Sequence, residues 1–299
     1  MASGSDYLKL HFIVFLWGFS AILGKLVSIP AVEMIVFRAF LAIIGMGLVI
    51  FFAKESLTVS KKDLVKLFLI GLIVALHWIS FFGSARISNV SVSLIGFATN
   101  SLWAALLEPW FTKTRIKKTE LFFGSFVLLG LYVIFSFDFH YKAGLALGIL
   151  AGFTSALFSV FNSGMVKRIG PRTITFYEMC GVWLGSLLFL PVYKQYWAAD
   201  GALHLTPRLQ DWIYIALLAG VCSVYAYTVA VELMKRISVF LMQLTLNLEP
   251  LYGIVIALLI FGDAEKMSFN FYVGTGIILI AVLSYPFLKK RFSKTVILD

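Results

Sequence analysis

Ten stretches of about 20 predominantly apolar residues follow one another along this chain of 299 residues, separated by short polar connections. Each stretch is long enough for one α-helix to cross the hydrocarbon core of a bilayer. A lipid-exposed span must satisfy its backbone polar groups internally, which favours helices here. The predicted spans are 7–28, 32–53, 64–84, 89–111, 117–137, 143–165, 172–193, 211–233, 238–261 and 269–290.

The composition excludes an ordinary soluble domain. Hydrophobic residues make up 61% of the chain and charged residues 13%, whereas soluble domains carry roughly 25% charged residues. The mean hydropathy is +0.94. This excess of apolar side chains faces lipid, and we predict an all-α integral membrane protein.

The net charge of +10 does not indicate a nucleic-acid partner, because the basic residues lie in the connections rather than on one polar face. If the N-terminus is cytoplasmic, that side holds 18 of the 25 lysines and arginines, and the opposite side holds six. The positive-inside rule then places both termini in the cytoplasm. We expect a multi-pass protein of the cell inner membrane, surrounded by lipids.

The two halves of the chain resemble each other, which predicts an internal repeat. A shift of 147 positions aligns Asn100 with Asn247 and Trp78 with Tyr225. Each half holds five predicted spans, an odd number, so the second copy enters the membrane from the opposite side. An inverted five-plus-five repeat around a central cavity suits alternating access. The predicted repeats are 1–140 and 141–299.

Glycines and prolines predict where helices pack closely or bend. Gly148-x-x-x-Gly152 and Gly181-x-x-x-Gly185 place small residues on one face, which lets helices approach closely. Pro109 and Pro250 remove helical hydrogen bonds inside their spans, so we expect kinks there.

Short motifs in both halves resemble those of a known family. They are Trp17-Gly18-Phe19-Ser20, Pro30, Arg38-Ala39-Phe40-Leu41-Ala42, Leu248-Glu249-Pro250 and Phe261-Gly262-Asp263, with Gly274 and Gly276 following. The ordered set resembles the EamA-type transporters of the drug/metabolite transporter superfamily over nearly the whole chain. Gly262-Asp263 departs from the usual Gly-Glu. The resemblance implies an inverted five-plus-five fold with a central cavity and, in bacteria, usually export of amino acids or related metabolites.

Charged residues at membrane depth are costly and therefore point to function. Arg38 and Glu249 are predicted to line the cavity, with Arg38 binding a substrate carboxylate and Glu249 an ammonium group or a proton. A structural ion pair between them is the alternative. Glu178 is a third candidate, facing either the cavity or the headgroups. For Glu108 and Glu232 we expect interfacial pairing with nearby lysines or arginines.

Uncharged side chains add further candidates for substrate binding. Asn100 and Asn247 lie near the middle of their spans, where a buried amide either binds solute or hydrogen-bonds between helices. On this hypothesis, aromatic rings are presented to a ligand by His77 and Trp78 in the third span and by Tyr225, with Tyr227 beside it, in the eighth.

The sequence contains no phosphate-binding glycine loop, no clustered metal ligands and no ordered catalytic triad. We therefore expect neither a cofactor nor a metal, and a small-molecule substrate moved by a gradient. A lipid-modifying enzyme with Glu249 or Glu178 as base, and a scaffold without transport, remain alternatives. Whether the chain forms a homodimer is left open.

Overall fold

The computed structural model describes residues 2–135, 141–198 and 200–295, and these residues form helices and no β-strand. Within them, eight segments are long and apolar enough to cross a membrane. They begin and end within a few residues of the predicted spans, since the apolar runs set their lengths. The eight segments are Gly4–Leu26, Ala31–Ala53, Lys61–Ile87, Val90–Thr112, Lys142–Met165, Pro171–Tyr196, Leu209–Leu233 and Val239–Glu265.

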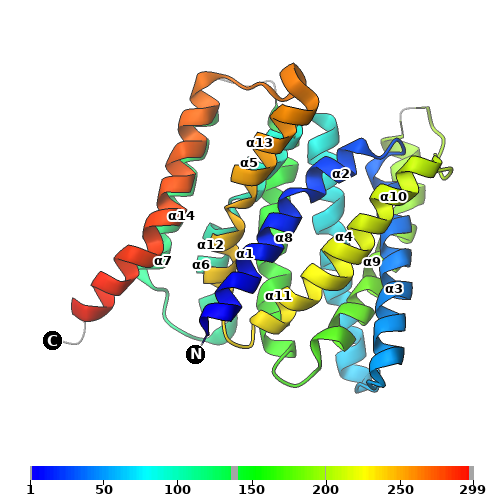
Figure 1. Cartoon of the computed structure of the whole chain (residues 1–299), viewed down its shortest axis with the longest axis horizontal. Helices are drawn as coiled ribbons and strands as arrows, with labels where there is room; N and C mark the ends of the chain where they lie inside the picture. The colour runs from blue at the N-terminus through cyan, green and yellow to red at the C-terminus, as the bar shows by residue number, and fades with distance from the viewer. Residues whose placement is uncertain (1, 136–140, 199, 296–299) are drawn as a thin grey trace.

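Several of these segments consist of more than one helix (Figure 1). The elements are α1 Gly4–Gly18, α2 Ser20–Leu26, α3 Ala31–Ala53, α4 Lys61–Ile87, α5 Val90–Phe97, α6 Asn100–Thr112, α8 Lys142–Met165, α9 Pro171–Tyr196, α10 Leu209–Leu217, the π-helix η1 Leu218–Tyr227, α11 Thr228–Leu233, α12 Val239–Leu246, α13 Glu249–Phe261 and the 3₁₀ turn η2 Gly262–Glu265.

Two further helices, α7 (Lys118–Phe135) and α14 (Phe269–Thr295), lie side by side at one edge of the bundle (Figure 1). A Cβ atom at Gly130 of α7 would lie 2.7 Å from the Gly274 oxygen of α14, so the two backbones touch. The predicted fifth span, 117–137, ends outside the described residues. Of the predicted tenth span, the described apolar part is Phe269–Ala281.

Short polar side chains begin many of the helices. Ser60 accepts a hydrogen bond from the Asp63 amide at 3.1 Å, and Asn89 accepts one from the Val92 amide at 2.8 Å. Ser238 plays the same part at the start of α12. Each cap satisfies a backbone N–H that the first turn of a helix leaves unpaired.

Two corresponding spans, Val90–Thr112 in the first half and Val239–Glu265 in the second, are each interrupted between two helices and are called the broken spans below. The break between α5 and α6 is at 98–99, and the break between α12 and α13 is at 247–248. Pro250 lies in the first turn of α13, where a missing N–H is tolerated, so it starts a helix rather than kinking one. The first break contains no proline, because Pro109 lies near the end of α6. The element ends correspond at a shift of 149 positions, two more than the shift that aligns the residue types.

A glutamate from each broken span caps the start of the other. Glu265, after α13, accepts hydrogen bonds from the Val90 and Ser91 amides at 2.9 and 3.0 Å. Glu108, in α6, accepts from the Val239 and Phe240 amides at 3.1 and 2.8 Å. The expected pairing of Glu108 with a basic residue is therefore wrong, because backbone amides at the start of α12 supply the partners instead.

Glycines allow the closest helix contacts in the bundle. Gly148 of α8 packs on Gly96 of α5, and Gly181 of α9 packs on Gly71 of α4. A Cβ atom at Gly96 would lie 2.8 Å from the Gly148 Cα, closer than carbon atoms approach without strain. The predicted close packing of the sixth and seventh spans at these glycines is confirmed, but α8 approaches α5 and α9 approaches α4 rather than α8 and α9 approaching each other.

Replacing Gly96 with alanine is expected to destabilise the protein by about 1–3 kcal/mol, because the added methyl group meets backbone that cannot rotate away. The melting temperature in detergent measures the effect. Gly164→Ala is the matched control, since a Cβ atom there meets nothing within 4 Å. Equal melting temperatures for the two variants would show that the α5–α8 contact can relax.

Candidate functional site

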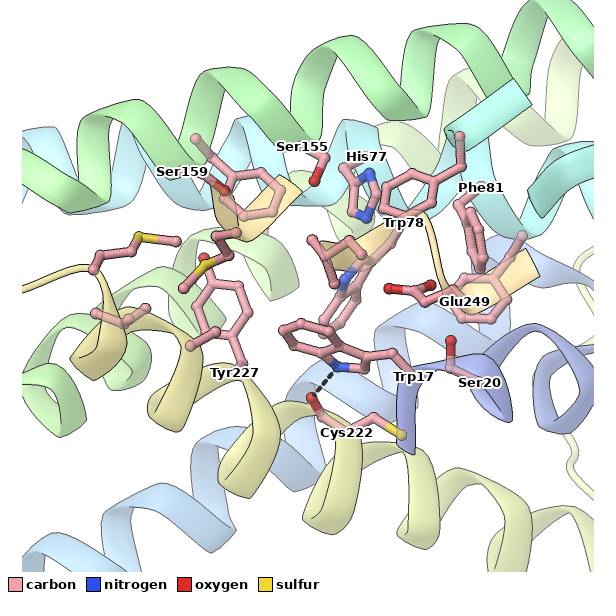
Figure 2. Close-up of a pocket in the computed structure, with 18 of the residues that line it drawn as sticks. Trp17, Ser20, His77, Trp78, Phe81, Ser155, Ser159, Cys222, Tyr227 and Glu249 are labelled. Atoms are coloured by element: carbon pink, nitrogen blue, oxygen red, sulfur yellow. Dashed lines mark hydrogen bonds between the residues drawn. The ribbon is translucent and has the colours of Figure 1, made fainter. Parts of the chain in front are cut away.

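Residues from both halves of the chain line a cavity of about 70 Å³ (Figure 2). Its walls come mainly from α1 to α5, α8, η1 and α11 to α13. Seven of the lining residues are aromatic: Trp17, Trp78, Phe81, Phe82, Phe97, Phe158 and Tyr227. Polar groups are few, and among them are one arginine and one glutamate. An apolar pocket with a few charged groups is typical of sites for small organic molecules.

Arg38 is held in α3 at the wall of this cavity and is 3% exposed. Its Nε donates to the Ser223 hydroxyl at 3.0 Å, and its guanidinium carbon lies 3.8 Å from the centre of a Trp78 ring. A cation over an indole face is stabilised by the ring quadrupole. Within the described residues, the two Nη groups make no hydrogen bond, so they are free to bind a ligand.

Glu249 is the first residue of α13 and is also 3% exposed. Its carboxylate points into the cavity among the aromatic side chains (Figure 2). In the described part of the chain it has neither a hydrogen-bond donor nor an ion-pair partner. The N-terminal end of α13 carries a partial positive charge that favours an anion there.

Arg38 and Glu249 do not form the structural ion pair that was the alternative interpretation. Among the described residues, no carboxylate lies within 4.0 Å of the guanidinium. The cavity therefore presents a guanidinium and a carboxyl group separately, and neither has an ion-pair partner among the described residues.

His77 and Trp17 shape the aromatic walls. The His77 Nδ1 is 2.9 Å from the Ala151 carbonyl oxygen, which assigns the ring proton to that nitrogen. The Trp17 indole N–H donates to the Cys222 carbonyl at 3.0 Å (Figure 2). Cys222 belongs to η1, and π-helical turns are frequent at functional sites because they reorient side chains.

The structure does not bring every candidate to the cavity. Tyr225 is 45% exposed and packs edge-on against Phe12 instead. Asn100 and Asn247 are fully buried but do not line the cavity. Asn247 donates a hydrogen bond between the two broken spans, to the Ser101 hydroxyl at 2.8 Å. Glu178 is buried behind the cavity wall.

Several lining residues were not among the sequence candidates, including Phe158, Ser155 and Ser159, whereas Tyr227 was a candidate beside Tyr225 and does line the cavity. Trp17 was quoted only as part of a motif. Tyr227 lies two residues after Tyr225, and residues two positions apart in a helix point in different directions. The π-helical turn changes the directions in which the side chains of this span point, and the apolar pattern of the span does not predict such a turn.

Comparison with known proteins identifies the family. The model of the EamA-like transporter family matches residues 7–136 and 142–287, one segment in each half. The chain belongs to the EamA-like transporter family. This membership indicates a membrane transporter of the drug/metabolite transporter superfamily with two EamA repeats, and it favours a carrier over a lipid-modifying enzyme because the family is one of transporters.

A solved structure described as "Crystal structure of protein" has the same fold as this EamA-like chain. It superimposes with a TM-score of 0.71, at 13% identity, over 97% of this chain and 99% of its own. At that identity the likeness concerns the fold alone. Among curated proteins, none matches the chain.

Proposed function

We propose that this EamA-like protein carries zwitterionic amino acids with large apolar or aromatic side chains. The observation that supports the proposal is that Arg38 and Glu249 line one aromatic cavity and neither has an ion-pair partner among the described residues. A guanidinium binds a carboxylate through two parallel hydrogen bonds. A carboxylate binds an ammonium group, and the aromatic rings pack on the apolar side chain.

The carrier on this proposal works by alternating access within an inverted repeat of ten helices. A cavity of about 70 Å³ has room for roughly two water molecules, so an amino acid enters only when the walls separate. The reciprocal caps by Glu108 and Glu265 support an inverted repeat, since each links the start of one broken span to the end of the other.

We also propose that both termini are cytoplasmic and that the carrier exports its solute across the inner membrane. The excess of basic residues on one side supports this orientation. Helix α1 begins, and α14 ends, at the same end of the bundle (Figure 1), which fits an even number of crossings. Export itself rests on the family resemblance.

Three solutes of similar shape test the proposal. Purified protein is reconstituted in liposomes loaded with unlabelled phenylalanine, and counterflow of labelled phenylalanine is measured. 3-Phenylpropionate lacks the ammonium group and 2-phenylethylamine lacks the carboxylate. We expect unlabelled phenylalanine to compete at least about tenfold better than either analogue, because each analogue leaves one buried charge unpaired.

Counterflow equal in empty liposomes and protein liposomes would contradict the proposal, and so would equal competition by all three solutes. The recovered label is also analysed by mass spectrometry. A chemical change in the solute would instead support an enzyme.

A further inference from the structure

A second polar cluster lies directly behind the cavity wall. Glu178 of α9 is fully buried, and its Oε2 accepts hydrogen bonds from the Tyr227 hydroxyl at 2.6 Å and from the Asn162 amide at 3.2 Å. Asn162 also donates to the Tyr227 oxygen at 3.1 Å. Tyr227 lines the cavity, so its ring separates the solute site from the Glu178 carboxyl group.

The two oxygens of Glu178 are in unlike surroundings. Both donors reach Oε2, whereas Oε1 is buried and has no hydrogen-bond partner among the described residues. The Oδ1 of Asn162 is another buried acceptor without a partner. An ionised carboxylate would leave negative charge on Oε1 unsolvated in a low-dielectric interior. A proton on Oε1 removes that charge and supplies the donor that the cluster lacks.

Within the part of the chain that the structure describes, no basic side chain forms an ion pair with Glu178. The titratable group in contact with its carboxyl group is Tyr227 of η1, and α8 contributes the Asn162 amide. Gly71 of α4 packs on the Glu178 backbone. Several ionisable side chains on the helices packed against α9 have partners other than Glu178. On α4, His77 contacts the Ala151 carbonyl and Asp63 pairs with Arg168. On α3, Arg38 donates to Ser223 and Glu33 accepts from the His204 amide, and on α11 Glu232 pairs with Arg236.

We propose that Glu178 is a proton-binding site that couples solute movement to a proton gradient, with Tyr227 as the link to the cavity. This inference rests on the proposed carrier function. The proton leaves Oε1 for water when the bundle opens, and the resulting carboxylate is held by the Tyr227 and Asn162 donors; reprotonation from water on the other side returns the neutral acid. Because Tyr227 also forms the cavity wall, a solute that moves its ring changes the donors available to Glu178.

The first test needs no solute. The infrared difference spectrum between wild type and Glu178→Gln, taken at neutral pH, is expected to contain the carbonyl band of a protonated carboxylic acid. Tyr227→Phe should shift that band, since it removes one hydrogen bond. Glu232→Gln is the matched control, because this glutamate is 45% exposed and pairs with Arg236. A difference spectrum with only carboxylate bands would overturn the proposal.

The second test measures coupling in proteoliposomes with labelled phenylalanine. A pH gradient of one unit is expected to drive wild-type accumulation by up to about tenfold for one proton per solute. Glu178→Gln should lose this accumulation and keep counterflow, and Glu232→Gln should keep both. Gradient-driven accumulation that persists in Glu178→Gln overturns the proposal, as does wild-type transport that ignores the gradient.

Two further outcomes separate the possible failures. Loss of counterflow together with a lower melting temperature in Glu178→Gln would show a structural role and overturn the proton site. Wild-type protein without phenylalanine counterflow would contradict the proposed solute class, while the infrared comparison still decides whether Glu178 holds a proton.

Discussion

Replacing Arg38 with alanine is expected to abolish phenylalanine counterflow while the protein remains folded and inserted. Truncating one partner of a buried, hydrogen-bonded charge pair costs about 2–5 kcal/mol, which weakens binding by roughly 30-fold or more. Arg38→Lys should restore little activity, because an ammonium group cannot form the two parallel hydrogen bonds of a guanidinium. Counterflow and melting temperature are measured together for both variants.

The analogues separate recognition from a general defect. In a binding assay on the purified protein, Arg38→Ala should weaken binding of labelled 3-phenylpropionate but leave binding of labelled 2-phenylethylamine nearly unchanged, since that amine has no carboxylate for Arg38 to bind. Arg115→Ala, in an exposed connection, is the control. Equal losses for both analogues, with a lower melting temperature, would assign Arg38 a structural role through Ser223 and Trp78.

Replacing Glu265 with alanine is expected to give the largest loss of stability in the chain. The Glu265 side chain is fully buried and accepts from Lys25 Nζ at 2.7 Å, from the Val90 amide, and from both the amide and the hydroxyl of Ser91. Its removal leaves these donors without a partner, and breaking a buried charge pair costs about 3–5 kcal/mol. Thermal unfolding in detergent measures the fall in melting temperature.

Two variants serve as controls for Glu265→Ala. Asp263→Ala changes an exposed carboxylate two residues away and should leave the melting temperature unaltered. Glu108→Ala removes the corresponding cap from α12 and should cost about 1–2 kcal/mol, because only backbone amides lose a partner. If Glu265→Ala lowered the melting temperature no more than Glu108→Ala does, the contact with Lys25 would contribute little to stability.

The loss of the Glu265 cap should also favour the conformation in which that side of the bundle is open, because Glu265 and Lys25 join η2 to α2 and α5 there. Faster reaction of a cysteine introduced at Asn89 with a water-soluble thiol reagent measures this opening. An unchanged reaction rate would limit the role of Glu265 to stability.

The sequence predicted which residues lie at membrane depth better than it predicted the directions in which their side chains point. Arg38 and Glu249 are exceptional within apolar spans, so their chemistry singled them out, and both line the cavity. Tyr225 was preferred to Tyr227 because the 147-residue shift aligned it with Trp78. The π-helix η1 and the 149-residue correspondence of the elements place Tyr227 inward instead.

In the two broken spans, too, the sequence predicts one feature and misses another. Pro250 predicts an interruption of the helix near the start of α13, because proline lacks the backbone N–H that a continuous helix needs. The break at 98–99 has no such signal. It lies where the two broken spans cross, near the hydrogen bond between Asn247 and Ser101, and that crossing joins residues separated by nearly half the chain.

The sequence alone determines that the chain enters a membrane, where its spans lie and how its basic residues are distributed among the connections. The reason is that the transfer of an apolar helix into lipid depends on the residues of that helix. The cavity, the separation of Arg38 from Glu249 and the enclosure of Glu178 behind Tyr227 depend on how each helix is rotated against its neighbours. In lipid, apolar side chains are stable on either face of a span, so the apolar pattern leaves that rotation open, and close packing at glycines and buried polar contacts decide it.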